Sequence, residues 1–340
     1  MVTHRTTGAR LGEPGFDGCG PDAGGPAGPE RGIGNTPLVR LDRLPLPSLR
    51  RAWGKLEWFN PGGSAKDRSA AAMVADALAS GIIGPGSVLV ESSSGNFGVA
   101  LARLCVRHGM SLHVVVDPRA NHLTVATTRA LGAVVHELDH PDPLTGDWLV
   151  ARRARVAELL AEVPDAVTLD QYSHRAAIRA HADGTMAEIV RDLGRAPDAV
   201  VVATSTTGTI GGCLAHVHER GLATQVVAVD ARGSVLFGGR RGERLLAGFG
   251  AGVEPPLAEG VVPDAVVRVA DADAIAGCRL LARTEGMLVG ASAGAVVHAL
   301  MTLGESFGPD VVAIFHDAGQ AYLDTVYDDA WVADHLGGWP

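Results

Sequence analysis

Residues 199–212 read Ala-Val-Val-Val-Ala-Thr-Ser-Thr-Thr-Gly-Thr-Ile-Gly-Gly. The first five residues form a continuous apolar run with the length of a buried strand, and a helical pattern follows over residues 209–220. A strand that is apolar throughout, without alternating polar residues, is typical of a parallel sheet covered on both faces. This stretch therefore predicts an α/β fold in which a strand turns directly into a helix.

The same alternation extends outward along the chain. Strands are also expected at residues 87–91, 112–116, 133–138, 225–229 and 311–315. Helices are expected at residues 96–107, 123–131, 149–160, 175–193 and 272–284. The strands pause around residues 161–198, so we place a boundary there between two lobes, residues 33–160 and 161–340. A chain of 340 residues is too long for one small core and suits two such lobes.

Composition and charge argue against several classes of function. The formal net charge is −9 at pH 7, which disfavours nucleic acid and anionic membranes as main partners. No stretch of about 18 residues is apolar throughout, and the N-terminus lacks the apolar core of a signal peptide. We therefore expect no membrane span and a cytoplasmic location. Residues 1–32 are rich in glycine, proline and charge, which predicts a flexible N-terminal extension.

The cysteines give no indication of a metal centre. The four of them are scattered, none forms a C-x-x-C pair, and no cluster of histidine and cysteine has zinc-site spacing. We interpret Cys105, Cys213 and Cys278 as reduced and mostly buried small residues.

A lysine lies in a second distinctive stretch, residues 55–68, which read Lys-Leu-Glu-Trp-Phe-Asn-Pro-Gly-Gly-Ser-Ala-Lys-Asp-Arg. Residues 60–63 form a turn and Ser64 can cap a following helix, which puts Lys66 in the first helical turn. A helix N-terminus disfavours positive charge, and a neutral amine is the form that reacts with an aldehyde. Taken alone, such a lysine is more often a solvated residue of a capped helix.

Two further segments carry polar groups at expected helix N-termini. Residues 91–98, Glu-Ser-Ser-Ser-Gly-Asn-Phe-Gly, follow one strand, and the loop 204–209 follows another. Hydroxyls and free backbone N–H groups at such junctions can bind an anion, although ordinary turns with serine caps have the same composition. Residues 285–295, Glu-Gly-Met-Leu-Val-Gly-Ala-Ser-Ala-Gly-Ala, contain Ser292, which alone would be a helix-cap serine.

Together these four segments resemble the cysteine synthase and cystathionine β-synthase family of pyridoxal 5'-phosphate (PLP) enzymes. The resemblance covers roughly residues 32–332 in the order and spacing of its motifs. It implies the two-lobed fold type II architecture, similar to the tryptophan synthase β subunit, with parallel-rich sheets flanked by helices. It also implies a homodimer. The first lobe would carry the cofactor lysine and a mobile substrate loop, and the second would bind the PLP phosphate.

The resemblance also implies roles for individual residues. Lys66 matches the lysine of the family motif Asn-Pro-x-x-Ser-x-Lys-Asp-Arg, so it would bind PLP covalently and act as general base once freed. Asn96 would donate to the phenolic oxygen of PLP, and Ser292 would face the pyridine nitrogen. The residues expected at the PLP phosphate are Ser205, Thr206, Thr207, Gly208 and Thr209. Those expected at the substrate are Ser93, Ser94, Phe97, Gln171 and Tyr172.

Three of these positions depart from the family pattern. Ser205 and Thr207 stand where the family has glycine, so we expect the backbone there to avoid positive φ or the local geometry to differ. Phe97 stands where the family usually has threonine, which replaces a hydroxyl contact with bulk and points to an unusual second substrate.

Segments 91–96, 233–238 and 321–331 are similar to a specialised branch of the family, the 2,3-diaminopropionate-forming synthases of siderophore and peptide-antibiotic pathways. That likeness implies O-phospho-L-serine and L-glutamate as substrates and N-(2-amino-2-carboxyethyl)-L-glutamate as product, with a partner dehydrogenase that cleaves it. A substrate phosphate needs basic groups, and the candidate is Arg119, with Arg244 behind it. The alternative for each is an ordinary surface arginine.

A cysteine synthase that uses O-acetylserine or O-phosphoserine with sulfide stays open as an alternative function, because it would share every cofactor residue. A catalytically silent scaffold subunit is a third reading.

Overall fold

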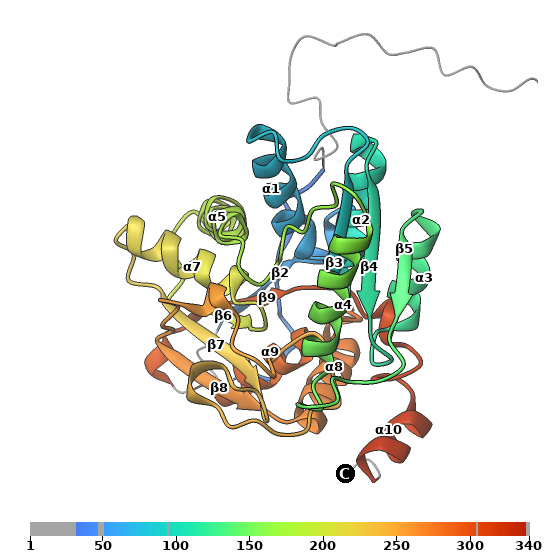
Figure 1. Cartoon of the computed structure of the whole chain (residues 1–340). Helices are drawn as coiled ribbons and strands as arrows, with labels where there is room; N and C mark the ends of the chain where they lie inside the picture. Colours follow the sequence, from blue (N-terminus) through green and yellow to red (C-terminus); the bar gives the residue numbers. More distant parts are fainter. Residues whose placement is uncertain (1–31, 47–50, 94, 304, 338–340) are drawn as a thin grey trace, which may run out of the picture.

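The computed structural model describes residues 32–46, 51–93, 95–303 and 305–337, and forms two sheets flanked by helices (Figure 1). The expected flexible extension, apart from residue 32, lies outside these residues. All six strands expected from the sequence are present, and the α/β fold with parallel-rich sheets is confirmed. No helix within the described ranges is long and apolar enough to cross a membrane.

The larger sheet has six strands, in the order β1-β2-β9-β6-β7-β8, and only the β1–β2 pair is antiparallel. Its strands are β1 (Leu38–Arg40), β2 (Arg51–Leu56), β9 (Asp310–Phe315), β6 (Ala199–Ala203), β7 (Gln225–Ala231) and β8 (Ala265–Val269). The smaller, parallel sheet has the order β3-β4-β5. Its strands are β3 (Val88–Ser92), β4 (Ser111–Val116) and β5 (Val134–Glu137).

The main helices alternate with these strands, as the sequence predicts. They are α1 (Lys66–Ala79), α2 (Asn96–His108), α3 (His122–Ala130), α4 (Trp148–Glu162), α5 (Ala176–Ala180), α6 (Ala187–Leu193), α7 (Gly208–Glu219), α8 (Asp271–Glu285), α9 (Ala291–Thr302) and α10 (Asp329–Leu336). The helix expected over residues 175–193 is not one regular helix, because a π-helical segment, His181–Met186, separates α5 from α6. A Cβ on Gly212 of α7 would lie 2.5 Å from the Cβ of His181, so glycine there allows α7 to pack directly on the π segment.

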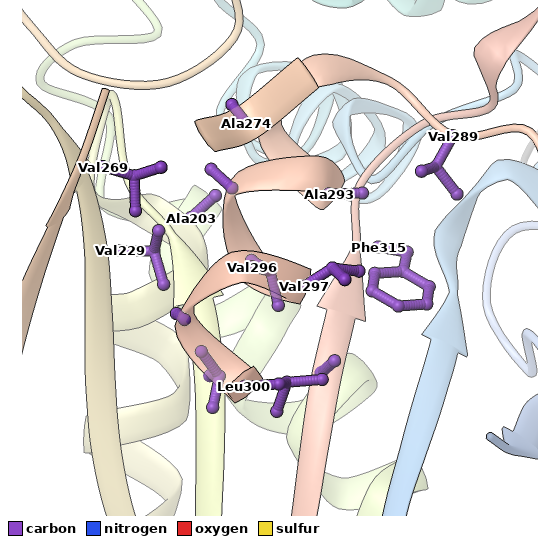
Figure 2. Close-up of a cluster of buried hydrophobic side chains, with 14 of the residues drawn as sticks. Ala203, Val229, Val269, Ala274, Val289, Ala293, Val296, Val297, Leu300 and Phe315 are labelled. Carbon is purple, nitrogen blue, oxygen red and sulfur yellow. The ribbon is translucent and has the colours of Figure 1, made fainter. Parts of the chain in front are cut away.

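Both faces of the larger sheet are covered, which explains its apolar strands. Successive residues of β6 belong to opposite clusters, with Val201 packed toward α8 and α9 and Val202 packed toward α6 and α7. Figure 2 shows Val296 and Val297 of α9 between Val229 and Phe315 of the sheet. Burial of these side chains from both sides gives this sheet its hydrophobic core.

The two sheets do not divide the chain at a single point. Strand β2 pairs in parallel with β9, so residues 51–56 belong to the same sheet as the C-terminal strands. A boundary near residue 160 therefore assigns β1 and β2 to the first lobe, although both strands belong to the larger sheet, whose other strands lie in the second lobe. Strands β1, β2 and β8 were not predicted from the sequence. The reason for β2 is visible at Lys55, a fully buried cation whose Nζ lies 2.8 Å from the Oε2 of Glu188.

Candidate active site

One cavity lies where the carboxyl ends of β6 and β9 meet the N-termini of α1, α2, α7 and α9. Every predicted cofactor residue lines this cavity, together with Ser93, Phe97, Gln171 and Tyr172. Ser94 lies outside the described residues, and Arg119 is absent from the lining. The carboxyl edge of a parallel sheet is the usual ligand site in α/β proteins, because helix N-termini gather there.

Lys66 is the first residue of α1, and its amine points into the cavity. The backbone N–H of Lys66 donates to Ser64 Oγ over 3.2 Å, although Ala65 is the N-cap residue. Lys66 Nζ lies 3.4 Å from Thr206 Oγ1 in the loop that precedes α7. Burial lowers the pKa of Lys66 to about 8, and the nearby Asp317 carboxylate opposes that shift. The neutral amine is therefore accessible near physiological pH, mainly through loss of water around it.

The loop between β6 and α7 presents hydroxyls and backbone N–H groups to the cavity. Of the two alternatives expected here, Ser205 follows the first, because its φ is not positive, whereas Thr207 has φ of 65° and does not avoid the left-handed region. Thr207 Oγ1 donates to the carbonyl oxygen of Thr206 over 2.7 Å, which uses its hydroxyl within the loop. The first N–H groups of α7 have no partners within the helix, and they suit a phosphate dianion.

Asn96 begins α2, as predicted, and its amide makes a contact that was not predicted from the sequence. Asn96 Nδ2 donates to Asp317 Oδ2 over 2.8 Å. Tyr322 OH donates to the same oxygen over 2.7 Å. The hydroxyl of Ser93 accepts from the N–H of Gly98 over 2.9 Å and so supports the first turn of the helix.

The remaining predicted substrate residues lie against the small lobe, which is formed by the smaller sheet and α2. Phe97 is 2% exposed, and it belongs to the apolar core of that lobe as well as lining the cavity. Gln171 Nε2 donates to the carbonyl oxygen of Ser92 over 2.9 Å, which ties it to the end of β3. Burial raises the pKa of Tyr172, so its hydroxyl stays protonated as a hydrogen-bond donor. Contacts of these side chains with a substrate stay predictions.

The two arginines proposed for a substrate phosphate lie outside the cavity lining. Arg119 Nε lies 3.0 Å from Asp117 Oδ1, and its guanidinium lies 5.9 Å from the centroid of the Trp148 ring. Its side chain is 54% exposed, so Asp117 and solvent already satisfy it. Burial lowers the pKa of Arg244, and the charge of Arg119 adds to that effect. A phosphate-binding role for either arginine stays a prediction.

Three cavity residues, His316, Asp317 and Tyr322, were not singled out from the sequence. The first two follow the expected strand at 311–315, and the position after a buried parallel strand is a signal that would have identified them. Burial lowers the pKa of His316 to about 3, so this imidazole is neutral. Its Nδ1 atom is buried with no hydrogen-bond partner among the described residues.

A second histidine that was not predicted from the sequence, His181, links α1 to the first turn of α7. His181 Nε2 lies 3.1 Å from Ser69 Oγ and 3.3 Å from Thr209 Oγ1, while Nδ1 lies 2.9 Å from Thr185 Oγ1. Burial lowers the pKa of His181, and the charge of Arg68 lowers it further. The neutral imidazole, with three hydroxyl neighbours, thus helps to position the N-terminus of α7. His181 also begins the π-helical segment, and such segments are often found near functional sites.

These groups match one kind of cofactor. A lysine with a lowered pKa suits an aldehyde, and the hydroxyl-rich N-terminus of α7 suits a phosphate. Ser292, which is 4% exposed at the start of α9, offers a hydroxyl to a ring nitrogen. Lys66, the N-terminus of α7 and Ser292 therefore fit the aldehyde, the phosphate and the ring nitrogen of PLP.

Comparisons with known proteins agree with this chemistry. Residues 29–317 match the family model described as "Pyridoxal-phosphate dependent enzyme". The chain is 41% identical over 303 residues to N-(2-amino-2-carboxyethyl)-L-glutamate synthase of Ralstonia nicotianae, covering 88% of this chain and 89% of the relative. It is 40% identical over 306 residues to the protein of the same name from Cupriavidus metallidurans, with the same coverage.

Solved structures give the same answer for the fold. The O-acetylserine-dependent cystathionine β-synthase of Helicobacter pylori superposes with a TM-score of 0.79 at 28% identity. The match covers 88% of this chain and 97% of that one. The protein thus belongs to the family of pyridoxal-phosphate-dependent enzymes, with the fold type II architecture and PLP as its cofactor.

Proposed function

We propose that this enzyme catalyses a β-replacement in which the amino group of L-glutamate displaces phosphate from O-phospho-L-serine. A C–N bond forms at the β-carbon, the C–O bond to phosphate breaks, and the phosphate departs with the electron pair. The product is N-(2-amino-2-carboxyethyl)-L-glutamate, a precursor of 2,3-diaminopropionate. The observation that carries the proposal is the half-buried Lys66 amine beside Thr206, in the loop before α7, in a chain 40–41% identical to synthases named for this product.

Lys66 is the residue proposed to move the proton of the substrate α-carbon. PLP, when bound, supplies an electron-withdrawing ring that acidifies this proton and lets the β-substituent leave. A pKa of about 8 keeps part of the Lys66 amine neutral near pH 7, as a general base requires. The hydroxyls of Ser205, Thr206 and Thr209 and the N-terminus of α7 would hold the cofactor phosphate.

The start of α2 is proposed to bind the substrate carboxylate. Asn96 and the first N–H groups of the helix face the cavity, and a helix N-terminus attracts an anion. Gln171, fixed through Ser92, and the bulk of Phe97 would shape the space for the second substrate and exclude water. Ser292 would face the ring nitrogen of the cofactor and, as a hydroxyl, leave it largely unprotonated.

One observation favours a second candidate, a cysteine synthase that uses O-acetylserine and sulfide. The described part of the cavity lining contains no arginine, and Arg119 pairs with Asp117 instead. An uncharged acetyl leaving group needs no such cation. O-phosphoserine with sulfide is the intermediate case, and all three reactions would use the same cofactor residues.

The proposal extends to partners and location. We propose a cytoplasmic homodimer whose product is consumed by a dehydrogenase. Support comes from the family resemblance and from the buried, unpaired thiols of Cys105, Cys213 and Cys278, which suit a reducing compartment.

Product identification tests the proposal directly. The PLP-loaded enzyme would be incubated with O-phosphoserine or O-acetylserine, each with ¹⁵N-glutamate or sulfide, and the products would be weighed by mass spectrometry. We expect a ¹⁵N-labelled glutamate adduct and one equivalent of phosphate from the first pair. Cysteine from sulfide, with no glutamate adduct, would replace the proposal with the cysteine synthase reading.

Lys66→Ala tests the cofactor link separately. The wild-type protein with PLP should absorb near about 410 nm, the band expected of PLP joined to a lysine. The variant should lack this band and turn over neither donor. A band that persists in the variant would place the cofactor on another amine.

A further inference from the structure

Asp317 is buried at the wall of the cavity and contacts two cavity side chains. Its side chain lies just after β9 and is 6% exposed. Oδ2 accepts from Asn96 Nδ2 over 2.8 Å and from Tyr322 OH over 2.7 Å. Oδ1 is buried with no hydrogen-bond partner among the described residues. A buried carboxylate with half of its acceptor capacity unused is costly, so its retention inside a ligand cavity points to a function.

The backbone around Asp317 joins the lysine and serine segments. Ser64 forms an antiparallel bridge with Asp317, and the N–H of Ala65 donates to the carbonyl oxygen of His316 over 2.8 Å. On the other side, the N–H of Gly290 donates to the carbonyl oxygen of Asp317 over 3.2 Å. The residues just before Lys66 and just before Ser292 are therefore both tied to the same short segment that carries Asp317.

Gly290 shows how tightly the carboxylate is held. A Cβ at Gly290 would lie 2.1 Å from Asp317 Oδ1 and 2.8 Å from the Tyr322 ring, far below normal contact. Only glycine permits this approach. Asp317 is thus enclosed by Asn96, Tyr322 and Gly290, so a shift of its carboxylate would displace these three residues.

We propose that Asp317 is a positioning residue, which orients the Asn96 amide toward the cofactor and supplies the negative charge beside Lys66. One Asn96 N–H is engaged by Asp317, which fixes the amide plane and leaves the second N–H to donate into the cavity. This role rests on the proposed function only in that Lys66 and Asn96 serve PLP. It is independent of the choice between glutamate and sulfide.

The groups that face Asp317 determine the sign of its effect. Lys66 is the cation beside it, while Asn96 and Tyr322 donate hydrogen bonds, and Cys278 of α8 and Tyr327 face the same region. His316 is neutral, because burial lowers its pKa to about 3. Burial raises the pKa of Asp317, whereas the two donors and Lys66 lower it. In return, the Asp317 charge stabilises the protonated form of Lys66.

The first experiment measures Lys66 in the cofactor-free protein. The rate at which a small anhydride acylates Lys66 is followed across pH by peptide mass spectrometry. Asp317→Asn should lower the apparent pKa of Lys66 by about one unit, from about 8, which is about fivefold more neutral amine at pH 7. Glu91→Gln neutralises an equally buried carboxyl that has no role beside Lys66, and it should leave the profile in place. An unchanged profile in Asp317→Asn would overturn the charge role.

The second experiment tests whether Asp317 acts through Asn96. The affinity for PLP is measured in a double-mutant cycle of Asp317→Asn and Asn96→Ala. We expect Asp317→Asn to weaken binding about tenfold in the wild-type background, within the range for a lost charge-assisted hydrogen bond. The loss should be under about twofold once Asn96 is gone. Equal losses in both backgrounds would contradict a positioning role.

Folding controls accompany both experiments. Circular dichroism and thermal melting establish that each variant is folded, and Asp317→Ser, which is smaller and neutral, replaces Asp317→Asn if the larger amide clashes with Gly290. Neither readout requires turnover, so a failure to make the glutamate adduct would leave this inference standing. Conversely, an unchanged Lys66 profile would leave the proposed reaction standing.

Discussion

Lys66 Nζ and Thr206 Oγ1 lie 3.4 Å apart, although 140 residues separate them in the sequence. The lysine opens α1, which packs on the small lobe, and the threonine precedes α7 on the larger sheet. This proximity places a lysine amine that is partly shielded from solvent next to a helix N-terminus, which repels cations. Both conditions favour the neutral amine, and burial is the largest cause of the lowered pKa of Lys66.

The first prediction concerns the pH dependence of cofactor attachment. Because burial lowers the pKa of Lys66 to about 8, the neutral, reactive fraction should rise through that pH and level off above it. The rate at which cofactor-free protein gains absorbance near about 410 nm after PLP is added, followed by stopped flow, should rise about eightfold from pH 6.5 to 7.5. A rate that stays flat over this range, or an inflection near the ordinary lysine value of 10.5, would show that the amine is solvated in solution.

A second prediction follows from the positive φ of Thr207. A residue with a Cβ in the left-handed region costs about 1 kcal/mol more than glycine, and Thr207 has φ of 65°. Thr207→Gly and Thr207→Ala both lose the hydroxyl, but only glycine relieves the backbone. In cofactor-free protein, Thr207→Gly should therefore be more stable than Thr207→Ala by about 1 kcal/mol in urea unfolding.

The same pair of substitutions at Thr209 is the control for Thr207. Thr209 lies in the first turn of α7 with ordinary helical geometry, and glycine in a helix is less stable than alanine by up to about 1 kcal/mol. The sign of the glycine–alanine difference should thus reverse between the two positions. The same sign at both would remove strain as the explanation.

The strands that could be predicted from the sequence are those whose apolar run is unbroken. Strand β6 is completely apolar and buried on both faces, and its predicted bounds agree with the structure. Strand β2 contains Arg51 and Lys55, whose partners Asp310 and Glu188 lie far away in the sequence. Local periodicity carries no information about such partners, so a strand with a buried, paired cation looks like a polar loop.

The candidate site shows the same limit. Lys66, Asn96 and Ser292 belong to contiguous motifs, and their approach to one cavity could be predicted. Asp317 is recognised only when β9 is known to end beside β2 and β6, since its role depends on Asn96, Tyr322 and Gly290. Arg119 lies outside the cavity lining and pairs with Asp117, two residues away, and its role toward a substrate phosphate stays a prediction.

A third prediction concerns the buried ion network behind the lysine helix. Glu188 Oε2 lies 2.7 Å from Arg68 Nη2 and 2.8 Å from Lys55 Nζ, with all three side chains nearly buried. Burial alone would raise the pKa of Glu188, but hydrogen bonds from Arg68 and Lys55 outweigh it and hold the pKa well below its usual range. Glu188→Gln leaves two buried cations short of a counter-charge, and it should lower the free energy of unfolding by about 3–5 kcal/mol.

An exposed pair supplies the control for Glu188. Glu158 lies 2.9 Å from Arg155 on α4 with a side chain that is 60% exposed, so Glu158→Gln should change the free energy of unfolding by less than about 1 kcal/mol. Both variants would be measured by urea unfolding near pH 7. Similar small losses in both would mean that water screens the Glu188 network in solution.

The fourth prediction concerns Glu91, at the end of β3 beside the serine loop. Its Oε1 accepts from the backbone N–H groups of Leu169 and Asp170 over 2.6 and 2.9 Å. Burial raises the pKa of Glu91 to about 7, despite these hydrogen bonds, which lower it. The folded protein therefore holds a proton that the unfolded chain, with an ordinary value of 4.5, releases between pH 4.5 and 7. By linkage, Glu91 should reduce stability progressively as the pH rises through this window.

Glu91→Gln isolates this effect, because glutamine keeps the acceptor oxygen and does not titrate. Every other group contributes equally to both proteins, so the difference in free energy of unfolding reports Glu91 alone. From pH 5 to 8 the variant should gain about 2–3 kcal/mol relative to the wild type, given about 1.4 kcal/mol per unit of pKa difference. A difference that stays constant across this range would mean that Glu91 is ionised throughout, with its charge compensated by the backbone donors of residues 169 and 170.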